Sequence, residues 1–339
     1  MLVLGIDTSC DDTAAAVVRD GREVVSNAVA TQHDLHAAFG GVVPEIASRA
    51  HAERMGVVVK RALAEANVTL GDLDAVAVTT RPGLVGSLLV GVAYAKALAW
   101  SRGLPLIDVH HIEAHAIAAR ADHPDLDYPF VALVVSGGHT ALYAVRGATE
   151  IVRLGQTRDD AAGECFDKVA VLLGLPQPGG PHVSRLAEGG RPDAVAFPRF
   201  RAEGERLEFS FSGLKTAVLH YVKGVGGRRD GPARPDLPVS LADVAASFER
   251  AAVDMLVGPS LRAAEREGVE DLVVGGGVAA NRVLRRVLAE RAPQGLRVRF
   301  PRMALCADNG AMIAMRGTEL LALGRRASLD ADVDPYAGD

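Results

Sequence analysis

A strand–turn–strand unit occurs twice in this chain, and the repetition limits the possible folds more than any other feature. The first copy reads MLVLGIDTS and then TAAAVVRDG, within residues 1–21, and the second reads PFVALVVSGGHTALYAVRG, residues 129–147. Each copy joins two apolar runs through a short polar turn, a pattern typical of an antiparallel hairpin. Because the copies lie about one domain length apart, the sequence predicts two related domains.

Strands and helices alternate after each hairpin. Residues 45–67 and 88–100 predict helices on either side of a buried strand at 72–80, and residues 270–291 predict a strand, a triple-glycine turn and a helix. This alternation predicts α/β domains. The 339 residues suffice for two such domains. We therefore assign residues 1–127 to an N-terminal domain, 128–330 to a C-terminal domain and 331–339 to a tail.

Charge and cysteine content restrict the partners and the compartment. The formal net charge of −5 means that a nucleic acid must meet a local basic patch. Two arginine clusters are candidates: Arg228, Arg229 and Arg234 in a Gly/Pro loop, or Arg282, Arg285 and Arg286 on a predicted helix. The three cysteines form an odd set without metal-type spacing, which indicates reduced thiols in a cytoplasmic protein.

No membrane segment is expected. The N-terminus lacks a basic stretch and becomes acidic within its first dozen residues, so it does not read as a signal peptide. The apolar run at residues 83–100 approaches membrane-spanning length, but it contains Lys96 and three glycines. A buried helix is the expected structure for this run.

His111 and His115 lie four residues apart in the segment HHIEAH. On a helix this spacing places both imidazoles on one face, where two can bind one metal ion. Two ordinary core or surface histidines are the alternative, and a third ligand is needed to decide. Glu113 follows His111 by two residues rather than one, so the His-Glu-x-x-His register of zinc proteases is absent.

The turns of the two hairpins and the turn at residues 275–277 are rich in small residues. Such turns can direct backbone N–H groups at phosphate oxygens, although each is more often only a tight turn. Taken in order, the two hairpins and the glycine-rich strand-to-helix turn resemble the duplicated ATP-binding fold of actin, hexokinases and heat-shock ATPases. That resemblance implies a nucleotide cleft between the domains.

Ten motifs restrict this resemblance to one family among the proteins of this fold. They run in order from residue 5 to residue 314: GIDTSCDDTAAAV, GGVVPEIASRAH, RPGLVGSLLVG, HHIEAH, VSGGHT, AAGECFDKVA, PGGP, FSFSGLKTA, GGGVAANRVLR and CADNGAMIA. Together they resemble the tRNA N6-adenosine threonylcarbamoyltransferase family, formerly described as sialoglycoprotein endopeptidases. The resemblance implies transfer of a threonylcarbamoyl group from threonylcarbamoyl-AMP to N6 of adenosine 37, in tRNAs that read codons beginning with A (t6A).

The resemblance also implies ligands and partners. His111, His115 and Asp308 would bind one divalent metal ion, either iron or zinc. ATP or AMP could occupy the adenylate site. The partners would be tRNA, a degenerate paralogue of the same fold and a small P-loop ATPase, with a homodimer as a further possibility. The donor would meet the turn at 134–138 and three residues beyond it; this set comprises Val134, Val135, Ser136, Gly137, Gly138, Asp167, Gly180 and Asn281.

Two acidic residues of the first turn are candidates for the catalytic base. Attack by N6 on the carbamoyl carbonyl requires a group that accepts its proton. We expect Asp11 in this role and Asp12 second, with a solvated acidic turn as the alternative. Asp308 has an alternative too, since an aspartate at the start of a helix is a favourable cap.

Three other functions compete with the transferase. A non-catalytic nucleotide-binding subunit of the same fold would be expected to lack the histidine pair and the Asp-Asn-Gly motif, and this chain has both. A metalloprotease is disfavoured by the register of Glu113, and a small-molecule kinase by the metal residues. Arg81 and Cys165 stand where small residues are expected in the family pattern, and Asp12 stands where glutamate is common.

Overall fold

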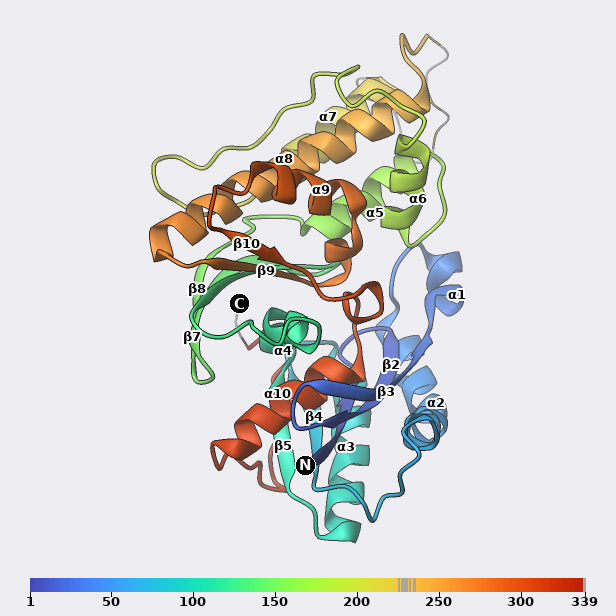
Figure 1. Cartoon of the computed structure of the whole chain (residues 1–339). Coiled ribbons are helices and arrows are strands. Elements are labelled where there is room, and N and C mark those ends of the chain that lie inside the picture. The colour runs from blue at the N-terminus through green and yellow to red at the C-terminus, as the bar shows by residue number, and fades with distance from the viewer. Residues whose placement is uncertain (225, 227–230, 232, 234–235, 338–339) are drawn as a thin grey trace. The chain divides into compact units, whose positions relative to one another are not determined.

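The chain forms two compact units (Figure 1). The computed structural model describes residues 1–224, 226, 231, 233 and 236–337. The first unit combines Met1–Leu126 with Pro301–Asp339, and the second unit is Asp127–Phe300. The basic-loop arginines Arg228, Arg229 and Arg234 lie outside the described residues.

The first unit is built on a five-stranded sheet with the order β3-β2-β1-β4-β5. Its strands are β1 (Leu2–Asp7), β2 (Asp12–Arg19), β3 (Glu23–Thr31), β4 (Ala75–Arg81) and β5 (Leu106–His110). β1, β2 and β3 pair antiparallel, whereas β1, β4 and β5 pair parallel. The expected first hairpin is therefore confirmed.

The helices of the first unit lie before and after these strands. They are α1 (His33–His36), η1 (Ala37–Phe39), α2 (Pro44–Glu65), α3 (Val85–Arg102), α4 (His111–Ile117), η2 (Ala118–Ala121), η4 (Met303–Leu305) and α10 (Gly310–Ala322). The apolar run at 83–100 forms most of α3, as expected of a buried helix. Among the described residues, no helix combines the length and apolar character needed to cross a bilayer.

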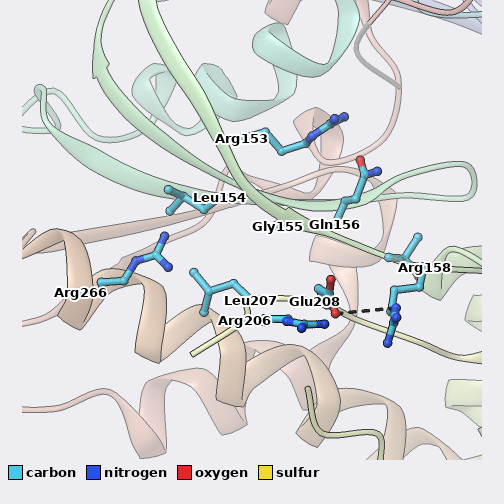
Figure 2. A pocket seen from close by; sticks show the side chains of 10 residues that line it. Arg153, Leu154, Gly155, Gln156, Arg158, Arg206, Leu207, Glu208 and Arg266 are labelled. Carbon is cyan, nitrogen blue, oxygen red and sulfur yellow. Dashed lines mark ion pairs between the residues drawn. The ribbon is translucent and has the colours of Figure 1, made fainter. Parts of the chain in front are cut away.

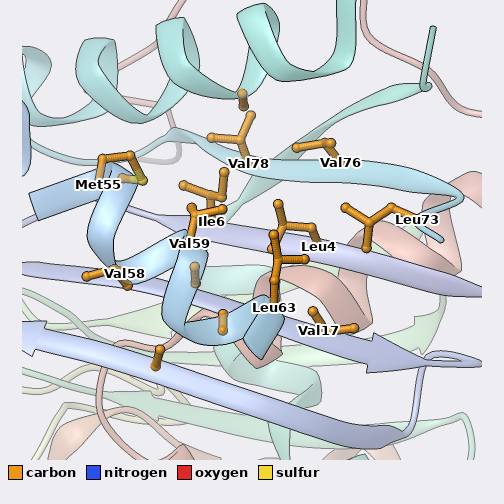
Figure 3. Close-up of a cluster of buried hydrophobic side chains, with 14 of the residues drawn as sticks. Leu4, Ile6, Val17, Met55, Val58, Val59, Leu63, Leu73, Val76 and Val78 are labelled. Atoms are coloured by element: carbon orange, nitrogen blue, oxygen red, sulfur yellow. The ribbon is translucent and has the colours of Figure 1, made fainter. Parts of the chain in front are cut away.

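The main core of the first unit lies between one face of the sheet and helices α2 and α3. Leu4, Ile6, Val76 and Val78 are buried there against Met55 and other α2 residues (Figure 3). Because neighbouring residues in a strand face opposite sides, Gly5 faces the other surface. A Cβ on Gly5 would lie 2.2 Å from the carbonyl oxygen of Gly310, so α10 packs closely on that second face.

This packing corrects the predicted domain assignment. We assigned residues 301–330 to the second domain, but α10 contacts β1, β2 and β4 and belongs to the first unit. The physical reason is the close approach allowed by two glycines, since a Cβ on Gly310 would lie 2.5 Å from the backbone nitrogen of Ala16. The chain therefore returns to its first sheet after completing the second unit.

The second unit repeats the topology of the first. Its sheet has the order β10-β9-β6-β7-β8. The strands are β6 (Phe130–Val135), β7 (Thr140–Gly147), β8 (Glu150–Gln156), β9 (Asp271–Gly275) and β10 (Arg297–Arg299). β6, β7 and β8 pair antiparallel, and β6, β9 and β10 pair parallel, as β1 to β5 do in the first unit. The predicted duplication of an α/β domain is confirmed.

In the part of the chain that the structure describes, four helices of the second unit lie between β8 and β9, and two more lie between β9 and β10. They are α5 (Ala162–Leu172), α6 (Gly179–Ala187), α7 (Ser212–Lys223), α8 (Leu241–Glu267), η3 (Gly277–Ala280) and α9 (Arg282–Arg291). β9, η3 and α9 are the strand, glycine turn and helix predicted for residues 270–291.

Candidate metal centre and glycine-rich turns

Three side chains of the first unit bring potential metal ligands together. His111 and His115 lie on α4, and Asp308 lies just before α10. The Nε2 atoms of His111 and His115 are 3.5 Å and 3.1 Å from Asp308 Oδ1. One ligand atom from each residue lies within 4.8 Å of the others, so the group can hold a metal ion.

The spacing of these atoms suits a transition metal. Ligand atoms about 2.1 Å from a tetrahedral ion lie about 3.4 Å apart, close to the observed separations. One nearby carboxylate oxygen, Asp12 Oδ1, is buried without a hydrogen-bond partner among the described residues. Unpaired buried carboxylates are costly, and a cation would offset that cost. The donor set of two imidazoles and one carboxylate therefore fits zinc or ferrous iron.

Asp7 is a member of this site that sequence reasoning missed. It is fully buried at the end of β1, and its Oδ2 lies 3.2 Å from Nδ1 of His111. The hydroxyl of Ser9 also lies 3.2 Å from the same nitrogen. When Nε2 binds a metal, Nδ1 carries the proton and faces these oxygens, an arrangement that fixes the imidazole ring. The signal in the sequence was an aspartate that ends an apolar strand.

The charges of the site agree with a cation-binding role. Burial alone would lower the pKa of His111, but the carboxylates of Asp7 and Asp308 outweigh burial and raise this pKa to about 10. Burial opposes ionisation of Asp308, yet the two histidines beside it hold its pKa well below the usual range. In the metal-free protein a proton thus occupies the position that a metal would take.

Asp308 is not the cap of α10. The side chain of Asn309 accepts a hydrogen bond from the backbone N–H of Met312 at 2.9 Å, which makes Asn309 the N-cap. The alternative that we considered for Asp308 is therefore wrong. Because its neighbour satisfies the helix, the Asp308 carboxylate faces His111 and His115.

Glu113 holds α4 against α10. Its Oε2 accepts hydrogen bonds from Nη2 and Nε of Arg316 at 2.7 and 3.1 Å. The Arg316 side chain is only 3% exposed and also donates to Glu319, which pairs with Arg120 at 2.8 Å. This network ties the helix that bears both histidines to the helix that follows Asp308.

Replacing Arg316 with methionine should destabilise the protein by about 3–5 kcal/mol, because it leaves two carboxylates without their buried partner. Chemical denaturation measures this change. Arg146→Met is the matched control, since Arg146 is 47% exposed and solvent screens its pairs with Glu150 and Glu267, so this substitution should destabilise far less. Equal effects of the two substitutions would contradict the role given to the network.

The two candidate bases differ in their surroundings. Asp11 Oδ2 lies 3.9 Å from Nε2 of His33, and 20% of its side chain is exposed. Asp12 begins β2, and its Oδ1 is buried. Burial, followed by the charges of Asp308 and Asp11, raises the pKa of Asp12 to about 7. Asp12 therefore exchanges its proton near neutral pH.

The raised pKa predicts that Asp12 affects stability in a pH-dependent way. The folded protein holds a proton on Asp12 between about pH 4 and pH 7, where the unfolded chain does not. Asp12 therefore costs no stability below about pH 4 and destabilises the protein progressively as the pH rises from about 4 to about 7, above which its effect is constant.

Asp12→Asn removes this titration. Without added metal, the variant should become more stable relative to wild type as the pH rises from 5 to 8, so the difference in their free energies of unfolding should increase. The upper limit is about 4 kcal/mol, from about 1.4 kcal/mol per pKa unit. Denaturant titrations at several pH values measure the difference, and a constant difference would contradict the assignment.

The predicted donor turn of the second unit is an open hairpin bend. Val134 and Val135 are fully buried in β6 and contribute only backbone, so the turn itself begins at Ser136. A Cβ on Gly137 or Gly138 would meet nothing within 4 Å, which leaves the outer side of the bend accessible. The carbonyl of Ser136 accepts a hydrogen bond from Gly163 in the first turn of α5.

A second glycine turn lies beside the first. β6 and β9 are parallel neighbours in which Val134 pairs with Gly275. Gly276 has φ = +91°, and a Cβ there would lie 2.3 Å from the carbonyl oxygen of Val135. Both turns therefore lie at the carboxyl ends of adjacent parallel strands, the position where open α/β sheets bind ligands. The start of α5 is bound to the first turn, because Ala162 donates to the hydroxyl of Thr140 at 2.9 Å and Gly163 donates to Ser136 at 3.1 Å.

Asp167, Gly180 and Asn281 have structural partners of their own. Asp167 Oδ1 accepts from the backbone N–H of Gly179 at 2.6 Å and so secures the start of α6, where Gly180 leaves open space. Asn281 caps α9 by accepting from Leu284 at 2.8 Å. Its amide also donates to Glu249 and Ser184, so contact with an adenylate would replace an existing bond.

Four other residues of the quoted sequence motifs have structural roles. Lys168 and Lys215 both pair with Asp160, which links α5 to α7. Arg81 pairs with Asp108 at 2.7 Å between β4 and β5. Cys165 is buried and reduced, and burial raises the pKa of its thiol.

Comparison with known proteins identifies the family. The family model TsaD, described as tRNA N6-adenosine threonylcarbamoyltransferase, matches residues 23–315. A protein of that name from Syntrophotalea carbinolica is 51% identical over 97% of this chain and 94% of its own length. Another from Geobacter metallireducens is 53% identical over 98% of this chain and 95% of its own length.

Solved structures support the fold. Component A of (R)-2-hydroxyglutaryl-CoA dehydratase from Acidaminococcus fermentans has a TM-score of 0.54 at 18% identity, and covers 95% of this chain and 99% of its own. A ROK hexokinase from Thermus thermophilus has a TM-score of 0.50 at 16% identity, and covers 96% of this chain and 99% of its own. The expected actin/hexokinase-type fold is confirmed.

Proposed function

Because the chain belongs to the tRNA N6-adenosine threonylcarbamoyltransferase family, we propose that it forms t6A in tRNA. The donor is threonylcarbamoyl-AMP, and the acceptor is N6 of adenosine 37 in tRNAs that read codons beginning with A. The observation that supports this proposal most is the approach of His111, His115 and Asp308 beside the buried carboxylate of Asp12.

His111, His115 and Asp308 hold one divalent metal ion, zinc or iron, and Asp7 orients His111. When bound, such an ion acts as a Lewis acid and stabilises negative charge. The histidines must be neutral to bind it, so metal uptake displaces the proton of His111.

Asp12 accepts the proton that N6 loses as it attacks the carbamoyl carbonyl. A general base works best when its pKa is raised toward the working pH, and in the metal-free protein burial, followed by the charges of Asp308 and Asp11, raises the pKa of Asp12 to about 7. Asp11, which sequence reasoning preferred, is the second candidate. AMP leaves as the new N6–carbonyl bond forms.

Ser136, Gly137 and Gly138 form the bend that binds the phosphate and acyl portions of the donor. The N–H of Ser136 donates to the carbonyl of His139 at 2.8 Å, so the backbone N–H groups of Gly137 and Gly138 contact the donor. The open outer side of this bend supports the assignment. Asp167, Gly180 and Asn281 lie beside the ribose and adenine portions of the donor. Asp167 and Asn281 shape this part of the site by holding the starts of α6 and α9 in place.

The chain works with partner subunits: a degenerate paralogue of the same fold and a small P-loop ATPase. One apolar surface of the first unit supports the first of these. Val85, Leu89 and Trp100 follow helical spacing on α3 and are 54%, 48% and 75% exposed.

Reconstitution tests the proposal. The purified chain, its paralogue and the ATPase are incubated with unmodified tRNA and threonylcarbamoyl-AMP, and t6A is measured by mass spectrometry of the nucleosides. We expect t6A at adenosine 37 only when the chain is present. Absence of t6A in the complete mixture, with intact donor remaining, would overturn the proposed activity.

A further inference from the structure

The second unit contains an open pocket of about 420 Å³ that none of the predicted site residues line. Figure 2 shows it between β8, the segment at 206–208 and the end of α8. Its charged side chains are Arg153, Arg158, Arg206, Arg266 and Glu208. The lining thus carries an excess of positive charge, in a chain whose net charge is −5.

The pocket is held in shape by backbone contacts. Phe209 donates to the carbonyl of Gln156 at 3.2 Å, and Arg158 donates to the carbonyl of Phe209 at 2.9 Å. A Cβ on Gly155 would lie 1.7 Å from the carbonyl oxygen of Leu207, so only glycine allows this approach. Leu207 and Phe209 are almost completely buried and anchor the segment. The arginines therefore extend from a fixed framework.

Arg158 and Arg266 form only loose ion pairs. Arg158 and Glu208 are 3.7 Å apart, beyond hydrogen-bond distance, and 55% of the Arg158 side chain is exposed. Arg266 is 3.6 Å from Glu267, a carboxylate that Arg146 also binds at 3.0 Å. Arg153 and Arg206 are exposed. Exposed guanidinium groups such as these bind phosphate oxygens in pairs of parallel hydrogen bonds.

The pocket suits the backbone of a nucleic acid better than a free nucleotide. A nucleotide base requires apolar or aromatic walls, and the lining supplies only Leu154 and the buried Leu207. Several separated arginines along an open surface instead match successive phosphates. Because the proposed substrate is tRNA, its phosphates are the expected occupant.

The pocket is also correctly located for this role within the second unit. Gln156, at the end of β8, pairs with Ala141, and Thr157 donates to the carbonyl of Thr140 at 2.8 Å. Thr140 immediately follows the bend at 136–139. One end of the pocket therefore lies beside the proposed donor turn, and Arg153 extends the basic surface away from it along the edge strand.

We propose that Arg153, Arg158, Arg206 and Arg266 form a tRNA-contacting surface that binds backbone phosphates. This inference rests on the proposed function, which supplies tRNA as the substrate. It names a surface different from the arginine clusters at 228–234 and 282–286 that the sequence suggested.

Salt-dependent tRNA binding tests this surface. The variant Arg153→Gln, Arg206→Gln and Arg266→Gln removes three arginines and keeps the contact between Arg158 and Glu208. Each lost phosphate contact should flatten the plot of log affinity against log salt by about 0.7–0.9. We therefore expect the slope to fall by about 2–3 and the affinity at low salt to fall at least tenfold.

The control variant is Arg102→Gln, Arg325→Gln and Arg326→Gln, which removes three exposed arginines of the first unit. Both variants have the same net charge, so a general electrostatic effect would change them equally. An unchanged salt slope in the pocket variant, or equal salt slopes for the two variants, would overturn the inference about this surface. The proposed function would still stand if the wild-type protein transfers the threonylcarbamoyl group to tRNA. Wild type that fails to bind or modify tRNA would overturn both.

Binding of AMP tests whether the pocket holds a nucleotide instead of tRNA phosphates. The pocket variant should bind AMP, measured by calorimetry, as tightly as wild type does. Loss of AMP affinity with an unchanged tRNA salt slope would identify the pocket as a nucleotide site and overturn the assignment to tRNA phosphates.

Discussion

Asp308→Asn should leave the purified protein almost free of metal. The substitution keeps the size of the side chain but removes the charge that both Nε2 atoms face at 3.1 and 3.5 Å. Loss of a partner outside the metal shell typically costs about 10–100-fold in affinity, so loss of a ligand should cost more than about 100-fold. Elemental analysis and competition with a chelator measure the occupancy and the affinity.

Asp122→Asn is a matched control for this experiment. The Asp122 side chain is 21% exposed, against 22% for Asp308, and it also lies in the first unit, where it pairs with Arg302 at 2.9 Å. This control should retain wild-type metal content. Full occupancy in Asp308→Asn would show that these three residues do not form the metal site.

The histidine pair of the candidate metal site could be predicted from the sequence because it depends on local spacing. His111 and His115 were expected on one helical face, and α4 spans His111–Ile117. The choice between Asp308 and Asn309 as helix cap was not readable, because both residue types are good caps and they are adjacent. Only the packing of α10 on β1 decides which side chain faces the histidines.

The return of α10 to the first sheet was also beyond sequence reasoning. Helical periodicity shows that residues 310–322 bury one face, but it does not show which sheet that face covers. Gly5 and Gly310 determine which sheet α10 covers, since each lacks the Cβ that would separate the helix from the strand. A glycine in a strand signals close approach of another backbone without naming the partner.

The two glycine-rich turns were predicted more completely from the sequence than the surroundings of the residues beside them. Glycine-rich turns after apolar strands have a local signature, and both bends lie where the strands predicted them. Asp167 and Asn281 were identified as ligand contacts, yet each makes hydrogen bonds that hold a helix terminus. Such partners lie far away in sequence, as Glu249 and Ser184 do for Asn281, and spacing does not reveal them.

Asp12→Asn should slow transfer to tRNA by about 10²–10⁴-fold, because a neutral amide cannot accept the proton of N6. The Asp12 carboxylate is the group whose pKa lies near 7, whereas Asp11 is partly exposed beside His33. Asp11→Asn is therefore the matched comparison and should transfer much faster than Asp12→Asn. Single-turnover modification of tRNA measures the rate, with metal content and calorimetric binding of a non-hydrolysable adenylate analogue measured alongside.

The pattern of losses separates the possible roles of the two carboxylates. A base should lose rate while donor affinity and metal content stay at wild-type values, since its interaction is made mainly in the transition state. If Asp11→Asn shows that pattern and Asp12→Asn does not, Asp11 is the base, as the sequence first suggested. If either variant loses donor affinity in proportion to rate, that residue positions the adenylate. If Asp12→Asn instead loses metal together with rate, the Asp12 carboxylate stabilises the ion held by His111, His115 and Asp308. Another group must then accept the proton of N6.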